Sequence, residues 1–346
     1  MSRRAGGLPE LGREFSVERA REVGVSRGRL RGGDLGRPFR GVRVLDSGPP
    51  PIASGDRAPS GSGVESHAFL RATDADRLRD LAARCRAFAT VMAPDAAFSH
   101  VTAALLHGMP VPRRLEVTRE SLHVTGPRRA STAAGVLGHQ ATLDPIDVID
   151  ARDSPVGIRV TTPERTLCDL APLLSLGELV AAADRALFHG DPLATRSSLA
   201  ECVSRHRGRR GRPTLLRALA LSTDLAESPP ESLLRVLLIE AGLPAPTPQV
   251  RVQDAQGREI ARVDLAYPEH RIAIEYEGDH HRTDRHQWRR DLARTRDLHF
   301  AAWVTLRTTP LDLAAPADML LQLRHWLTTR APDPAPAPAP APDPPR

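Results

Sequence analysis

Two short apolar segments separated by four residues constrain the fold of this chain more than any other feature. Residues 263–267 read VDLAY and residues 272–276 read IAIEY, with PEHR between them. Both have the length and the β-branched or aromatic side chains typical of strands, and Pro268 begins a turn. Because the connection is so short, we expect the two strands to lie side by side in one sheet.

Each of these strands carries carboxylates where an apolar side chain would be expected. Side chains alternate along a strand, so Val263 and Leu265 should point to one face and Asp264 to the other. On the second strand, Glu275 and Glu277 should share one face. The sequence therefore predicts that Asp264, Glu275 and Glu277 converge on one side of the sheet.

Carboxylates gathered in this way repel one another and raise one another's pKa, so a cation is needed nearby. Oxygen ligands of this kind are typical of Mg²⁺ or Mn²⁺ sites. Such an ion polarises a phosphate oxygen and supplies a hydroxide nucleophile. The acids alone therefore favour a site for Mg²⁺ or Mn²⁺.

The elements around the two strands complete a domain over residues 223–330. A helix begins after Ser228, with Pro229 in its first turn and Glu231 three residues after the cap, which predicts a capping box. A strand pair joined through the DAQG turn follows, then the acid-bearing strand, a basic helix, a fourth strand and a closing helix. The expected order is αβββαβα.

These residues resemble the PD-(D/E)xK restriction-endonuclease superfamily, and most of all its branch similar to the very-short-patch-repair (Vsr-like) endonucleases. The matching positions are Asp264, Glu275, Glu231 on the preceding helix, and the GxxH run from Gly278 to His281. The resemblance implies that Asp264 and Glu275 hold a catalytic Mg²⁺, with Glu231 as a further metal ligand. It also implies an Mg²⁺-dependent endodeoxyribonuclease.

The remaining roles follow from the same resemblance. Glu277 or His281 would orient the attacking water, so both are candidate catalytic residues. Arg290 and Arg294 on the basic helix would contact the phosphates of the DNA backbone.

The chain departs from this superfamily at one position. The motif ends in a lysine two residues after the glutamate, and Glu277 stands there. All 48 residues counted as lysine or arginine are arginine, so no lysine elsewhere can replace it. Either His281 or an arginine takes its place, or the site is weak, or it has lost catalysis.

The first 45 residues read as a small winged helix-turn-helix. FSVERAREVGVSRGRL contains one helical pattern, a turn at Gly24 and a second helix starting at Ser26, followed by a short strand pair. Arg27 and Arg29 would then lie on the helix that enters the DNA major groove, and Arg40 on the wing. The alternative is a small helical cap with a solvated arginine face.

Composition divides the rest of the chain. Residues 46–65 are rich in Pro, Gly and Ser and predict a linker, and the Ala-Pro repeat of residues 331–346 predicts a disordered tail. Residues 66–222 predict a mixed α/β domain. Its histidines, His100, His107, His123 and His139, lack the spacing of a metal motif, so we expect structural or surface residues.

The first two-thirds of the chain resembles the abortive-infection type IV antitoxin family (AbiEi-like). The segments that carry this resemblance are FSVERAREVGVSRGRLRGGDLGRPFRGVRV, AFSHVTAALLHGMPVP and TTPERTLCDLA. The resemblance implies a winged helix followed by an α/β domain, DNA binding, and a toxin protein as a partner.

Charge and cysteine content narrow the classes of function. The net charge of +6 and the use of arginine alone suit contact with phosphate. The three cysteines are far apart and predict neither a disulfide framework nor a zinc motif. No apolar stretch has the length of a signal peptide core or a membrane span, so we expect a cytoplasmic protein.

Three hypotheses remain open at this point. The first is a metal-dependent DNA endonuclease, acting in phage defence or DNA repair, that an N-terminal winged helix delivers to the duplex. The second is a non-catalytic DNA-binding transcriptional regulator of antitoxin type. The third is a protein-interaction module of phage defence that does not contact nucleic acid.

Overall fold

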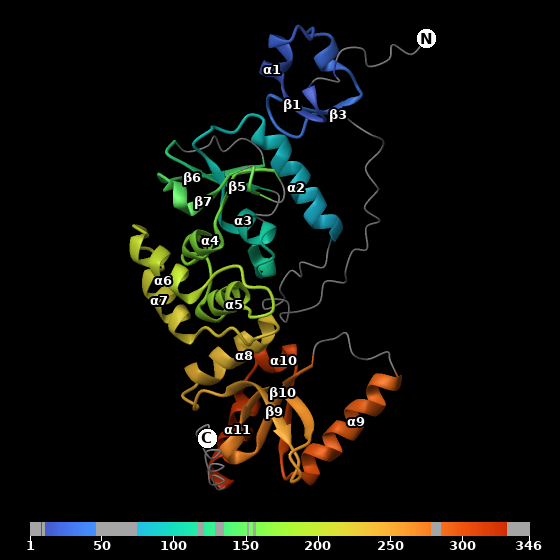
Figure 1. The fold of residues 1–346 in the computed structure, drawn as a ribbon, viewed down its shortest axis with the longest axis vertical. Helices are drawn as coiled ribbons and strands as arrows, with labels where there is room; N and C mark the ends of the chain where they lie inside the picture. The colour runs from blue at the N-terminus through green and yellow to red at the C-terminus, as the bar shows by residue number, and fades with distance from the viewer. Residues whose placement is uncertain are drawn as a thin grey trace, which may run out of the picture. The chain divides into compact units, whose positions relative to one another are not determined.

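The computed structural model describes residues 8, 11–45, 75–115, 121–128, 135–150, 152–154, 157–277 and 285–330. The side chains of residues 75–76 and 285–292 are outside this description, as are the predicted linker and tail. The chain forms two compact units, residues 1–222 and 223–346, drawn from blue to yellow and from yellow to red in Figure 1. Each combines helices with sheet, so the predicted mixed α/β class is confirmed.

The N-terminal region of the first unit is a three-stranded sheet with one short helix. The strands are β1 (Glu14–Ser16), β2 (Leu35–Gly36) and β3 (Val42–Leu45), in the order β1-β3-β2, and the helix is α1 (Val17–Glu22). Ser16 caps α1 by accepting a hydrogen bond from the N–H of Arg19. Phe15, Ala20 and Leu30 are buried together, which joins the sheet to the helix.

The second helix predicted here is much shorter than a recognition helix. Only one 3₁₀ turn, η2 (Arg29–Arg31), forms after Gly24. Arg29 forms two hydrogen bonds to Asp34, at 2.8 and 2.6 Å, and its guanidinium thereby stabilises the turn. Arg43 donates to the carbonyl of Leu30 and holds the turn against β3. A helix that could lie along a major groove is therefore absent from the described residues 11–45.

The rest of the first unit is built on a five-stranded sheet in the order β6-β5-β4-β8-β7. The β5–β6 and β4–β8 pairs are parallel, and the β4–β5 and β7–β8 pairs are antiparallel. The strands are β4 (Ala97–Phe98), β5 (Leu122–Gly126), β6 (Val136–Gln140), β7 (Val148–Ile149) and β8 (Val160–Thr161).

Six helices accompany this sheet. They are α2 (Ala75–Ala89), α3 (His100–Leu106), α4 (Pro163–Leu170), α5 (Leu176–Leu187), α6 (Arg196–Arg205) and α7 (Arg212–Leu221). Phe39 and Val42 of the N-terminal region share a core with Leu81 and Cys85 of α2, so the two regions of this unit pack as one body. Helices α4 to α7 form a group beside the sheet (Figure 1).

The basic run between α6 and α7 is an ordered turn rather than a flexible connection. Gly211 adopts φ +77°, and a Cβ there would lie 2.5 Å from the carbonyl of Ala171, so only glycine fits. Arg212 donates to the carbonyls of Val203 and His206, which fixes the start of α7 to the end of α6.

The second unit is a four-stranded sheet in the order β12-β11-β10-β9. Strands β9, β10 and β11 pair antiparallel, and β11 and β12 pair in parallel. Its elements are α8 (Pro229–Glu240), β9 (Thr247–Gln253), β10 (Glu259–Tyr267), the 3₁₀ turn η6 (Pro268–His270), β11 (Ile272–Tyr276), α9 (Arg285–Phe300), β12 (Val304–Thr308), α10 (Pro310–Ala314) and α11 (Ala317–Thr329). The predicted order holds, with the short helix α10 added after β12.

Helices cover both faces of this sheet. On one face, Leu234 and Leu238 of α8 and Leu323 of α11 pack with Leu265 and Ile274. On the other, Leu298 of α9 packs with a second cluster that includes Val263, Ala266 and Ala273. A carboxylate on the face of the sheet that α9 covers is therefore half enclosed by a helix and only partly exposed to water.

The sheet is irregular beside Asp264. Val263 belongs to the α9-side cluster and Leu265 to the opposite one, so the prediction that both share a face is wrong. Gln249, which the register places opposite Asp264, has φ +51°, a left-handed conformation that non-glycine residues rarely adopt. Such local distortion interrupts the alternation of side chains and is concentrated at functional sites.

Candidate functional site

Asp264 and Glu275 lie close to each other on the neighbouring antiparallel strands β10 and β11, just beyond the last residue pair of their ladder, Leu265 with Ile274. Oδ2 of Asp264 accepts a hydrogen bond of 2.9 Å from the N–H of Tyr276. The charges of Asp264 and Glu277 both act on Glu275, so the three acids lie near one another; that they share one side of the sheet stays a prediction.

An arginine from α9 sits against this pair. Nη2 of Arg294 lies 3.1 Å from Oε1 and 3.2 Å from Oε2 of Glu275. Glu275 is only 7% exposed. Its Oε1 is buried and has an ion-pair contact but no hydrogen bond of acceptable geometry. This oxygen therefore keeps a lone pair available to a further cation.

Burial raises the pKa of both carboxyl groups. For Glu275, desolvation has the largest effect, Arg294 opposes it, and the charge of Asp264 adds to it. For Asp264, desolvation again leads, and the hydrogen bond from Tyr276 opposes it. Raised pKa values in a half-enclosed pair of acids are typical of functional sites, because burial without full compensation lowers stability.

Glu231 extends the acid pair from the start of α8. Its carboxylate accepts hydrogen bonds from the Ser228 hydroxyl at 2.7 Å, from the Glu227 N–H at 3.1 Å and from Gln249 at 2.9 Å. The predicted capping box is wrong in detail, because the backbone donor that Glu231 contacts is that of Glu227. Desolvation, reinforced by the charge of Asp264, raises the pKa of Glu231 to about 6.

We expect Glu231→Gln to change how stability depends on pH. Because the folded protein binds a proton at Glu231 more tightly than the unfolded chain, this group stabilises fully below pH 4.5, and the effect is lost as pH rises through about 6. The free energy of unfolding of Glu231→Gln, relative to wild type, should thus rise by about 2 kcal/mol between pH 4.5 and 7.5. Urea unfolding in chelator, followed by tryptophan fluorescence, measures this, and a pH-independent difference would contradict it.

Glu277 occupies the position where the resembled superfamily has lysine, and its charge is paired. Oε1 of Glu277 lies 2.9 Å from Nη1 of Arg307, and both side chains are nearly half exposed. Arg307 stands beside Glu275 in the parallel register between β11 and β12. Two arginines, Arg294 and Arg307, therefore supply positive charge where the motif lysine is missing.

The other predicted site residues lie either outside the described part of the chain or in the N-terminal region. His281 and the GxxH run lie outside the described residues, as does the side chain of Arg290 on α9. Arg27 and Arg40 are exposed in the N-terminal region, whereas Arg29 is bound to Asp34. Arg29 is therefore a poorer phosphate ligand than predicted, because its two nitrogens already face a carboxylate.

Two of the acids, Asp264 and Glu275, suit a shared divalent ion, whereas Glu231 does not join them as a third ligand. Among the described residues, Asp264, Glu275 and Glu231 do not bring ligand oxygens within 4.8 Å of one another as a group. Oε1 of Glu275, which has an ion-pair contact but no hydrogen bond, and the nearby Asp264 suit Mg²⁺ or Mn²⁺, because such ions keep several waters and use one or two carboxylates. Glu231 stands beside this pair and raises the local negative charge.

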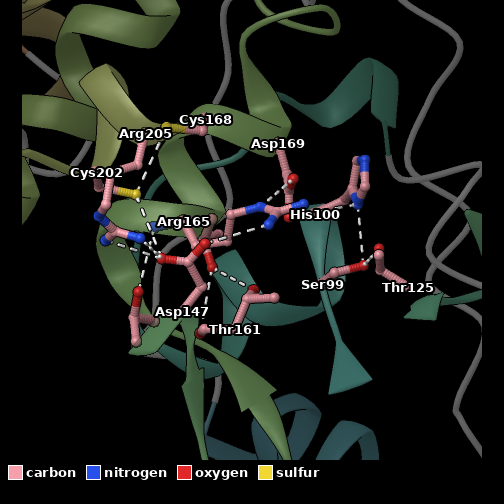
Figure 2. Close-up of polar contacts among 12 residues, drawn as sticks. Ser99, His100, Thr125, Asp147, Thr161, Arg165, Cys168, Asp169, Cys202 and Arg205 are labelled. Atoms are coloured by element: carbon pink, nitrogen blue, oxygen red, sulfur yellow. Dashed lines mark hydrogen bonds and ion pairs between the residues drawn. The ribbon is translucent and has the colours of Figure 1, made fainter. Parts of the chain in front are cut away.

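A second group of charged residues is buried in the first unit (Figure 2). Asp147 contacts Arg165 at 3.3 Å and Arg205 at 3.1 Å, and Nε of Arg165 donates to Asp169 at 2.9 Å. These residues join the 3₁₀ turn before β7 to α4 and α6. The network links three chain segments and includes two fully buried aspartates, so it holds the helical group to the sheet.

Three histidines of the same unit meet, although nothing in their spacing predicted it. The rings of His100 and His139 stack with centroids 3.6 Å apart, and Nδ1 of His123 lies 3.1 Å from Nε2 of His139. His123 and His139 are brought together by the parallel pairing of β5 with β6, and His100 begins α3. Only tertiary structure combines residues so distant in sequence, so no local motif signals this cluster.

Comparison with known proteins places the chain among relatives whose names state no activity. It is 30% identical over 226 residues to the uncharacterized proteins Rv2248 and MT2308 of two Mycobacterium tuberculosis strains. The matched region is 65% of this chain and 78% of each relative. No family model and no solved structure matches the chain. The extent of this match shows that the chain belongs to the same family as these two mycobacterial proteins.

Proposed function

We propose that this protein is a metal-dependent DNA endonuclease whose reaction centre is the carboxylate pair of the C-terminal unit. The observation that carries the proposal is the proximity of Asp264 and Glu275, half enclosed under α9, with one oxygen of Glu275 lacking a hydrogen bond. Asp264 and Glu275 would hold Mg²⁺ or Mn²⁺. A bound ion there supplies polarisation of a phosphate oxygen and a water of lowered pKa.

The arginines of the site have separate roles in this proposal. Arg294 neutralises Glu275 and faces the same enclosed space, so it would contact a phosphate oxygen of the substrate. Arg307 is held by Glu277 beside β11 and supplies positive charge near the pair. In the same proposal, Arg27 and Arg40 of the N-terminal region add phosphate contacts that do not depend on sequence.

A cleavage assay on the full chain tests the proposal. We expect supercoiled plasmid to be nicked with Mg²⁺ or Mn²⁺ and not with EDTA, and the double variant D264N/E275Q to be inactive. Both substitutions keep the size of the side chain and an acceptor oxygen. Equal nicking by wild type and double variant would show contamination, and no nicking by either would overturn the proposal.

One observation favours a second candidate, a non-catalytic DNA-binding regulator of antitoxin type. Arg294 already contacts both oxygens of Glu275, so a cation of the protein compensates the acid without a metal. Tight, salt-sensitive binding of duplex DNA by the same preparation, with no cleavage at any metal concentration, is the expected result for this function.

A further inference from the structure

We infer that His100, His123 and His139 form a binding site for a transition-metal ion in the first unit of the chain, and that the ion bound there is Zn²⁺. The site is independent of the proposed function, because it lies in another unit and uses nitrogen ligands. Imidazole prefers zinc and its neighbours in the periodic table, whereas carboxylate pairs prefer Mg²⁺.

The spacing of the ligand atoms fits one ion. Among the described residues, these three side chains are the group of histidine, cysteine or acidic residues whose ligand atoms all lie within 4.8 Å of one another. Two imidazole nitrogens on a tetrahedral zinc are about 3.3 Å apart, given Zn–N bonds of about 2.0–2.1 Å. Nδ1 of His123 and Nε2 of His139 are hydrogen-bonded at 3.1 Å, close to this value, so a bound ion would take the place of the proton between them.

Three separate elements hold the histidines in place. His123 and His139 lie on the adjacent parallel strands β5 and β6, on the same face of the sheet, because His139 pairs with Thr125 two residues beyond His123. His100 follows β4 and has φ +50°, a conformation that costs free energy for a residue other than glycine. His100 is the first residue of α3, and its ring stacks on the ring of His139.

Hydrogen-bonding partners around His100 match those of a metal ligand. Its Nδ1 lies 2.9 Å from Oγ of Ser99, which is itself bonded to the Thr125 hydroxyl at 2.7 Å (Figure 2). Oδ2 of Asp169 is buried without a hydrogen-bond partner and lies 3.9 Å from the same Nδ1. Metal-binding histidines usually direct their second ring nitrogen at such an oxygen, which leaves Nε2 for the ion.

The protonation state of the rings also fits metal binding. Desolvation, reinforced by the charges of neighbouring histidines, lowers the pKa of His100 to about 2 and that of His123 to about 4, so both rings are neutral. Neutral imidazole is the form that binds metal.

The experiment uses the full, untagged chain carrying D264N and E275Q, so that the carboxylate pair cannot contribute. After treatment with EDTA, one equivalent of Zn²⁺ is added, the protein is desalted, and metal is measured by mass spectrometry. We expect about one zinc per chain, retained in a large excess of Mg²⁺. Less than about 0.1 zinc per chain would overturn the inference, whatever the outcome of the nuclease assay.

Substitutions at His139, which is half-buried, assign the ligands. We expect His139→Asn to weaken zinc binding at least about 100-fold, and His325→Gln, at an exposed histidine of α11, to leave it unchanged. We expect His139→Cys, loaded with Co²⁺, to show a sulfur-to-cobalt charge-transfer band that the parent chain lacks. Cobalt bound without that band, or undiminished zinc in His139→Asn, would show that residue 139 is not a ligand.

Discussion

Asp264→Asn is expected to reduce metal-dependent DNA cleavage at least about 100-fold, because a bound ion contributes several kcal/mol to the transition state. The same substitution should leave the C-terminal unit as stable as, or more stable than, wild type in chelator. The asparagine oxygen keeps the hydrogen bond from the Tyr276 N–H. It also removes the buried charge that raises the pKa of Glu275.

This opposition between activity and stability distinguishes a metal ligand from a structural residue. All three tryptophans, Trp288, Trp303 and Trp326, lie in the C-terminal unit, so urea unfolding followed by fluorescence reports on it alone. Glu269→Gln, a matched loss of one carboxylate in the exposed turn before β11, serves as control and should change neither quantity. Parallel losses of activity and stability in Asp264→Asn would show that the residue acts only through folding.

Arg165→Met is expected to destabilise the first unit by about 3–5 kcal/mol, the usual cost of removing one partner from a buried ion pair. Arg165 is 6% exposed and contacts both Asp147 and Asp169. Without it, Asp169 keeps a buried carboxylate with no close cation. Desolvation already raises the pKa of Asp169 to about 6 despite Arg165, so the loss of this guanidinium should favour its protonation.

The measurement is thermal or urea unfolding followed by far-UV circular dichroism, since the first unit contains no tryptophan. The matched control is Arg185→Met. Arg185 pairs with Asp191, whose side chain is 77% exposed, and exposed ion pairs of this kind contribute about 0–1 kcal/mol. If both substitutions cost the same, the buried network does not stabilise the unit as its geometry implies.

The sequence predicted best where the decisive contacts are local. The strands that carry Asp264 and Glu275 are separated by a turn of a few residues, so the short connection was enough to predict that they pair. Strand alternation failed at Val263, because the left-handed Gln249 on the neighbouring strand disturbs the pleat. No residue pattern in the sequence marks that distortion.

Contacts between distant segments were beyond sequence reasoning. His123 and His139 meet because β5 pairs with β6 in parallel, and parallel pairing leaves no turn signal between the strands. His100 joins them from the start of α3. In the N-terminal region, the pattern after Ser26 suggested a helix. The hydrogen bonds of Arg29 to Asp34 close a single 3₁₀ turn instead. Val23, at the end of α1, is 41% exposed, because no second helix covers it within the described residues 11–45.

Ion binding at the proposed cation site depends on what Arg294 binds. Because it contacts both oxygens of Glu275, an ion that takes either oxygen must compete with it. Coupling of this kind is reciprocal. A ligand that draws Arg294 away from Glu275 raises the affinity of Glu275 for the ion by some factor. The bound ion then raises the affinity of Arg294 for that ligand by the same factor. If the proposed function holds, a phosphate group of the DNA is such a ligand, and it would recruit the ion only when DNA is bound.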